Sequence, residues 1–140
     1  MSCVLRASGP EFDVDSFLKD STLKPLLVYR RGALRFPDSK LAPEEKSGMN
    51  VSVSVREFSD LPRQIEDAVR FLSNNSDELK RLRNFPGVER LELDFPVEDR
   101  DVAVQSDLFP ARLLLLMGDL RIGLTVSHYP PSPSSAPQSG

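Results

Sequence analysis

The segment MNVSVSVR, residues 49–56, alternates apolar and polar side chains without a break. Val51, Val53 and Val55 fall on one side of an extended chain, whereas the serines and Arg56 fall on the other. Because successive side chains of a strand point to opposite faces of a sheet, this pattern is typical of a strand with one buried and one exposed face. Any fold that contains it must include a sheet that is apolar on one side only.

The same one-sided pattern returns later in the chain. In VERLELDF, residues 88–95, Leu91, Leu93 and Phe95 alternate with charged residues, which predicts a further strand. We also expect a strand over 122–129, and shorter strands over 3–7, 26–31 and 102–105. We expect these strands to form one sheet.

Apolar residues at spacings of three and four predict helices between the strands. Leu61, Ile65, Leu72 and Leu79 belong to one such stripe, which continues across the weak helix formers at 74–76, so we expect a kinked helix with both halves on one surface. Pro62 fits its first turn. Two further helices are predicted, over 14–19 with Asp13 as cap and over 108–120 with Asp107 as cap.

The predicted order is therefore β-α-β-β-α-β-β-α-β. It indicates an α+β fold with a mainly antiparallel or mixed sheet and with helices packed on one face. We expect residues 1–130 to form a single domain and residues 131–140, rich in proline and serine, to be a disordered tail. The polar face of the sheet would then be open to water or to a partner.

Composition limits the cellular compartment and the kinds of partner that we expect for this domain. The 140 residues carry a net charge of −3 and a single cysteine, the N-terminus has no signal-peptide pattern, and the longest apolar run is 113–117. We therefore expect a cytoplasmic protein without a membrane span. The predicted open face offers Tyr129 as its one aromatic residue and also carries carboxylates, so we do not expect a nucleic-acid partner.

The residues that could perform chemistry are few. His128 shares the alternation of Ile122, Leu124 and Val126, which predicts a side chain on the core side of the last strand. One histidine and Cys3 cannot supply a zinc site, and no glycine-rich phosphate loop is present, so we expect no cofactor and no metal. The acidic residues between 92 and 101 are interpreted as a solvated turn or as a surface for a basic partner.

The long loop between the second and third predicted strands is the other candidate. Its segment 30–46 has a net charge of +2, whereas the turn 92–101 has a net charge of −4. Opposed patches of this kind can orient a partner. The candidate partner-binding residues on the loop, the turn and the open face are Arg30, Arg31, Arg35, Arg56, Arg90, Glu92, Asp94, Glu98, Asp99 and Tyr129.

Several segments together support a family resemblance: VYRRGALR, KSG, FSDLPRQIEDAVRFL, RDVAVQSDLFP and IGLTVSHYP. With these segments the chain resembles, over residues 1 to about 130, a group of small uncharacterised bacterial proteins akin to immunity-protein-like domains. The resemblance implies a bacterial cytoplasmic protein with a neutralising or scaffolding role and a protein partner. It implies no reaction.

We therefore expect a non-enzymatic protein–protein interaction module, of immunity type if the resemblance holds. Two alternatives stay open. One is a small hydrolase or transferase with Asp94 or Asp101 as base and with Arg30 or Arg31 holding an anionic substrate. The other is a homodimer formed through the apolar helix at Leu113–Met117.

Overall fold

The computed structural model describes residues 2–34, 37 and 40–131. Within them the elements follow in this order: β1 (Val4–Gly9), α1 (Val14–Lys19), β2 (Pro25–Tyr29), β3 (Ser47–Ser52), α2 (Leu61–Asn74), α3 (Ser76–Arg83), β4 (Arg90–Glu98), α4 (Ala111–Asp119) and β5 (Gly123–Tyr129). The α+β class predicted from the sequence is confirmed.

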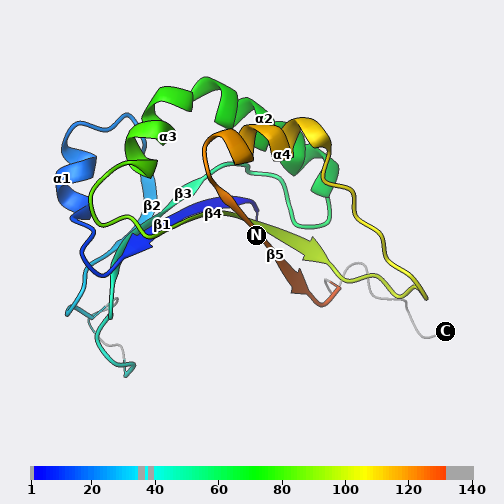
Figure 1. Ribbon diagram of the computed structural model, residues 1–140. Coiled ribbons are helices and arrows are strands. Elements are labelled where there is room, and N and C mark those ends of the chain that lie inside the picture. Colours follow the sequence, from blue (N-terminus) through cyan, green and yellow to red (C-terminus); the bar gives the residue numbers. More distant parts are fainter. Residues whose placement is uncertain (1, 35–36, 38–39, 132–140) are drawn as a thin grey trace.

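The strands form one open, mixed sheet in the order β2-β3-β1-β4-β5 (Figure 1). β1 pairs antiparallel with β3 and β4, and β2 pairs antiparallel with β3, whereas β5 runs parallel to β4. A parallel neighbour requires a crossover connection, and α4 lies on the connection from β4 to β5. The register places Leu5 opposite both Val51 and Leu93, so the three central strands turn apolar side chains to the same face.

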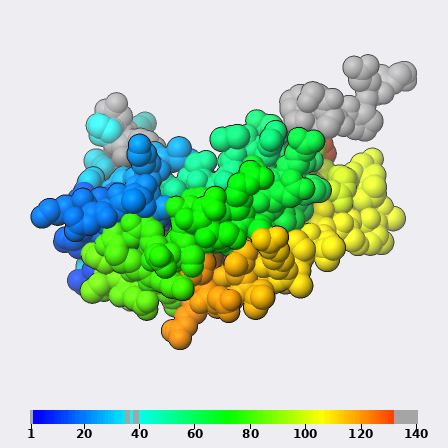
Figure 2. Space-filling model, turned by 90° about the horizontal axis from the view of Figure 1, so that it is seen from above, coloured from blue at the N-terminus to red at the C-terminus, as the bar shows by residue number. Residues whose placement is uncertain are grey.

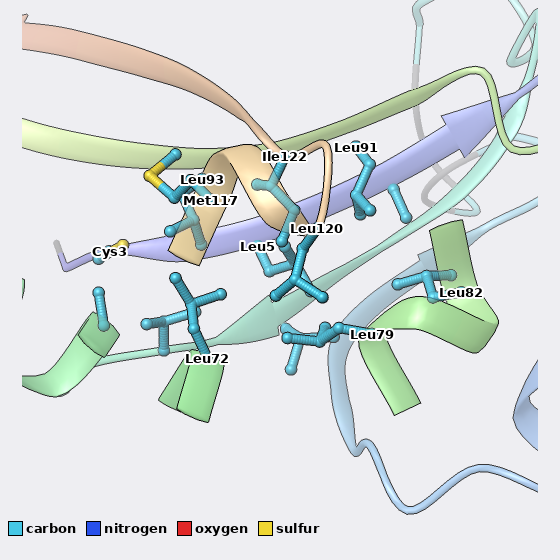
Figure 3. Packing of buried hydrophobic residues seen from close by; sticks show 14 of the residues in the cluster. Cys3, Leu5, Leu72, Leu79, Leu82, Leu91, Leu93, Met117, Leu120 and Ile122 are labelled. Atoms are coloured by element: carbon cyan, nitrogen blue, oxygen red, sulfur yellow. The ribbon is translucent and has the colours of Figure 1, made fainter. Parts of the chain in front are cut away.

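The helices cover that apolar face and leave the other one bare (Figure 1). Leu5 and Leu93 of the sheet meet Leu72, Leu79 and Met117 of the helices in one buried cluster (Figure 3). Burying side chains of this size contributes about 1.5–3 kcal/mol each, which is why the helices stay on the apolar side. The one-sided arrangement expected from the alternation is confirmed.

Local sequence explains most of the helix boundaries. The Asp13 carboxylate accepts a hydrogen bond from the Ser16 amide at 3.1 Å, as the predicted cap of α1 should. Hydrogen bonding with Ser16 also lowers the pKa of Asp13. Pro62 stands in the first turn of α2, and the helix breaks at Asn75, the predicted weak point. Both halves bury their leucines against the sheet.

The strand predicted over 49–56 is placed differently. β3 begins at Ser47 and ends at Ser52, and Val55 is 86% exposed, although Val51 and Val53 are buried. The amides of Val53 and Ser54 both donate to the carbonyl of Cys3, which ends the regular ladder. Val55 therefore leaves the sheet.

The segment 102–105 is not a strand, and α4 starts later than predicted. Gln105 closes a loop instead: its side chain accepts from the Arg100 amide at 2.8 Å and donates to the Glu98 carbonyl at 3.1 Å. Asp107 accepts from Gln105 and Arg100, so it does not cap the helix, and α4 begins at Ala111 after Pro110. Local side-chain bonds compete here with the predicted strand pairing and helix cap.

Two further expectations concern the C-terminal tail and a membrane span. Of the predicted tail 131–140, only Pro131 is described and the rest lies outside the described residues. None of the helices in the described ranges combines the length and the apolar character that crossing a bilayer requires.

Candidate partner-binding surface

The bare face of the sheet carries a network of polar side chains. Asp94 on β4 accepts from Arg6 on β1, with the Arg6 Nη2 3.1 Å from its carboxylate, and from the Ser127 hydroxyl of β5 at 2.7 Å. Glu92 accepts from Thr125 at 2.6 Å. The alternation of β4 explains this, because Arg90, Glu92 and Asp94 fall on the side away from the helices. The network holds three neighbouring strands together across the open face.

A hollow of about 400 Å³ lies at one end of this network. It is lined by Ser2, Val4, Arg6, Leu26, Asp94, Pro96 and Tyr129. The hollow therefore combines the Arg6–Asp94 ion pair with an aromatic ring. Of the predicted site residues, Asp94 and Tyr129 meet here, and Arg90 and Glu92 lie on the same face, joined by a hydrogen bond of 3.1 Å.

A larger and more apolar groove of about 560 Å³ lies where β4 ends and α2 begins. Its apolar lining consists of Phe58, Leu61, Pro62, Ile65, Val97, Leu108 and Pro110. Figure 2 shows the segment that follows β4, in yellow, at the end of the helix layer beside the start of α2. Leu108 is 82% exposed although it belongs to this lining, so an apolar side chain stands at the open lip of the groove.

The walls of the groove are fixed by hydrogen bonds from buried or half-buried glutamines. Gln64, fully buried in α2, donates to the carbonyls of Glu57 at 3.1 Å and Pro96 at 3.3 Å. Gln105 spans the opposite wall, as described above, and donates to Asp107 at 2.9 Å. A groove held in this way is formed before any partner arrives, which lowers the entropy cost of binding.

The groove and the hollow meet at one pair of aromatic rings. Phe58 lines the groove, Tyr129 lines the hollow, and their ring centroids are 6.1 Å apart in an edge-on arrangement. The groove and the open sheet face therefore adjoin at this contact, and we call the two together the docking surface.

The rim of the groove carries mostly negative charge. Glu66, Glu98 and Asp107 line it together with one cation, Arg100, whose guanidinium lies 3.2 Å from Asp107. The exposed Asp99 follows directly after β4. Of the predicted acidic residues, Glu98 lies on the groove itself.

Arg30 and Arg31, the arginines of the basic loop that the structure describes, do not line the groove or the hollow. Arg30 donates twice to Asp15 of α1, both at 2.8 Å, and Arg31 donates to Glu11 at 2.8 Å. The hydrogen bond with Arg30 lowers the pKa of Asp15, and the same bond raises the pKa of Arg30. Arg35 lies outside the described residues.

Arg56 also lies elsewhere, since its nearest carboxylate is that of Asp67 on α2, at 3.9 Å. The prediction from the sequence therefore assigned to one surface two groups of charged residues that lie on separate parts of the molecule. Arg56 lines a different hollow, beside the exposed Val55.

His128 falls on the helix side of the sheet, as its alternation predicted, because the register sets it beside the buried Val97, but it is not covered. The side chain is exposed and its Nδ1 lies 3.1 Å from Asp99, because β5 is an edge strand whose far end is not covered by the helices. Cys3, by contrast, is fully buried, and burial first and the nearby Asp94 second raise the pKa of its thiol. A thiol in such a site is poorly suited to act as a nucleophile.

No group of three or more histidine, cysteine or acidic side chains in the described ranges is placed to hold a metal ion. The groove itself was missed by the sequence analysis. Its signal was present in Leu108-Phe109-Pro110, an apolar stretch directly after the polar turn, which was interpreted as the start of a helix.

Comparison with family models, curated proteins and solved structures finds no match for this chain. The resemblance to immunity-protein-like domains therefore stays a prediction, and the function has to be argued from the docking surface.

Proposed function

We propose that this protein is a non-enzymatic interaction module that holds a segment of a partner protein in the apolar groove, with the open sheet face as the adjoining contact. The exposed Leu108 at the lip of a groove of about 560 Å³ is the observation that carries the proposal. An apolar side chain of a partner that enters the groove would remove Leu108, Phe58 and Pro62 from water together. Apolar hollows with polar rims are typical of such contacts.

The rim charge indicates what kind of segment fits. Glu66 and Glu98 on the groove, with Asp99 beside it, favour an apolar segment that is flanked by lysine or arginine. Long-range attraction between these charges would speed the encounter, whereas the apolar contacts would slow dissociation.

The carboxylate-dependent enzyme receives less support from the geometry. Both oxygens of Asp94 already accept hydrogen bonds, from Arg6 and Ser127, and Arg30 is engaged by Asp15 on another part of the molecule. A base and an anion clamp would have to act on one substrate. An immunity-type role in the bacterial cytoplasm, with a toxin as the partner, is the narrower form of our proposal and follows from the sequence resemblance alone.

Selection from a random peptide library displayed on phage tests the proposal without knowledge of the partner. We expect the selected peptides to combine a large aliphatic or aromatic residue with neighbouring lysine or arginine. Their affinity should fall about tenfold or more in Leu108→Glu, because the loss of the apolar contact outweighs the added attraction between the new carboxylate and the basic residues of the peptide. Val55→Glu, which changes an equally exposed valine elsewhere, is the matched control and should bind normally.

Three outcomes would overturn the proposal. They are a library that yields no binder, selected peptides that are acidic, and peptides that bind Leu108→Glu as tightly as the unchanged protein. Far-ultraviolet circular dichroism of both variants checks that the fold is intact.

A further inference from the structure

The two edges of the sheet differ in how they are protected against pairing with another strand. β2, at one edge, starts with Pro25 and has an irregular register between Pro25 and Leu27. Proline and bulges are common means of preventing edge-to-edge association. β5, at the other edge, reads GLTVSHY and contains neither proline nor a residue that is charged at neutral pH. In the described chain β5 pairs only with β4.

The free hydrogen-bonding groups of β5 can be assigned from its existing bonds. The carbonyl of Tyr129 accepts from the amide of Asp99, so it points toward the β4 side. Because backbone groups alternate in direction along a strand, the N–H and C=O groups of Leu124, Val126 and His128 point away from β4. These three alternate residues form one half of a ladder that has no partner strand among the residues that the structure describes.

This half-ladder is complementary to itself. An antiparallel pair centred on Val126 sets Leu124 of one copy opposite His128 of the other, which satisfies all three outward positions with about six hydrogen bonds. The charges agree with this direction, because the exposed Arg121 precedes the strand and the exposed Asp99 lies beside its end. Antiparallel pairing brings these opposite charges together twice, whereas parallel pairing would set like charges side by side.

The helix above the same edge has its own uncovered apolar surface. α4 lies along one margin of the helix layer (Figure 2), and its Leu114 and Leu115 are 45% and 65% exposed. The apolar residues all round this helix predicted that it packs against other residues on more than one side. Within one chain, however, only Leu113 and Met117 of the helix are buried. Arg112 lines a hollow shared with α2, so this side of α4 faces α2. Leu114, two residues later, lies on the opposite side of the helix and therefore faces away from α2.

We propose that two copies of this chain associate through antiparallel pairing of their β5 strands, with the Leu114 side chains of the two α4 helices meeting above the junction. A two-fold axis normal to the sheet at Val126 keeps the helix layers of both copies on the same side. The result is a continuous sheet of two copies. This inference rests on β5 and α4 and is independent of the groove.

Sedimentation velocity and amide hydrogen exchange of the whole chain over a dilution series test this inference. We expect the mass of two chains at high concentration. The amides of Leu124, Val126 and His128 should be protected only while the dimer is present, whereas those of Thr125 and Ser127 should be protected at every concentration by β4. His128→Pro removes one outward donor without touching the β4 ladder, and Leu114→Glu places a charge at the helix contact. Both should shift the equilibrium to single chains.

Leu108→Glu is the control, since it lies on the groove and should leave the dimer unchanged. A single-chain mass at all concentrations would overturn the inference. So would a dimer in which the three outward amides exchange freely, because the copies would then meet elsewhere. If β5 serves instead to bind a strand of another protein, the chain alone stays monomeric, which also rejects the self-pairing.

Discussion

Tyr129 meets Phe58 edge-on, with the two ring planes at 61°. Tyr129 is the last residue of β5, and Phe58 lies just before α2, so this contact joins the end of the sheet to the start of the helix layer. It also joins the two parts of the docking surface.

A double-mutant cycle on this ring pair should give a coupling free energy of unfolding of about 0.5–1.5 kcal/mol, the usual size for edge-on aromatic rings. The variants are Phe58→Leu, Tyr129→Leu and the two together, followed by urea unfolding. Additive effects would mean that the rings do not meet in solution.

Glycine 48 should not tolerate a side chain. A Cβ atom at Gly48 would lie 2.5 Å from the Tyr29 hydroxyl and 2.6 Å from the Ala7 carbonyl, so Gly48→Ala must push β3 away from its neighbours. We expect a loss of about 1–3 kcal/mol in the free energy of unfolding. Gly118→Ala is the matched control, because nothing lies within 4 Å of its Cβ, and the gain in helix propensity should stabilise α4 by about 0.5–1 kcal/mol. Equal effects of the two changes in thermal unfolding would contradict the close approach at Gly48.

Glu78 should make stability depend on pH. Burial raises the pKa of its carboxyl, but hydrogen bonds from Arg81, the Thr22 amide and Ser21 outweigh that effect and leave the pKa below its ordinary value of 4.5. A lowered pKa in the folded state stabilises the fold above 4.5, and this stabilisation is lost as the pH falls through the folded-state value.

Glu78→Gln should therefore cost about 1–2 kcal/mol at neutral pH and progressively less in acid, measured by urea unfolding at several pH values. Glu66→Gln changes an exposed carboxylate and should stay within about 0.5 kcal/mol of the unchanged protein. A Glu78→Gln deficit that persists unchanged into acid would show that the carboxylate charge is not its cause.

The Cys3 thiol should be inert in the folded protein. It is fully buried, and its pKa is raised mainly by that burial. Alkylation by iodoacetamide should follow the rate of global unfolding and become fast only in denaturant. Fast labelling of the native protein would mean that the N-terminal end of β1 opens locally.

The fold was largely predictable because its strands and helices carry strong periodic patterns. The alternation at Leu91–Phe95 and the stripe from Leu61 to Leu79 each predicted an element that the structure contains. The predicted strand positions of Val55 and of the segment 102–105 were wrong. Alternation alone does not reveal whether a neighbouring strand is there to pair with.

The docking surface was less predictable. Asp94 and Tyr129 were placed on the open face correctly, but the groove is built from Phe58, Pro62 and Leu108, which come from three separate segments. Such a meeting depends on the tertiary packing of α2 against β4. The loop arginines were expected to contact a partner, yet Arg30 and Arg31 find carboxylates within their own chain.

Charge reversal at the rim should affect how fast a basic peptide binds. Glu98→Lys with Asp99→Lys should slow association about tenfold at low salt, and the effect should fade as salt screens the charges. Stopped-flow fluorescence measures this. Asp20→Lys with Asp77→Lys makes the same change in net charge beside a different hollow and should leave association nearly unchanged.

The most direct test of the binding account is an amide chemical-shift titration of the isotope-labelled protein with a peptide from the selection. We predict that the largest shifts fall on residues around the groove, among them Phe58, Glu66 and Leu108, and extend through Tyr129 to the open face. Shifts confined to the loop at 30–46, or to the surface around Val55, with the groove unchanged, would contradict it.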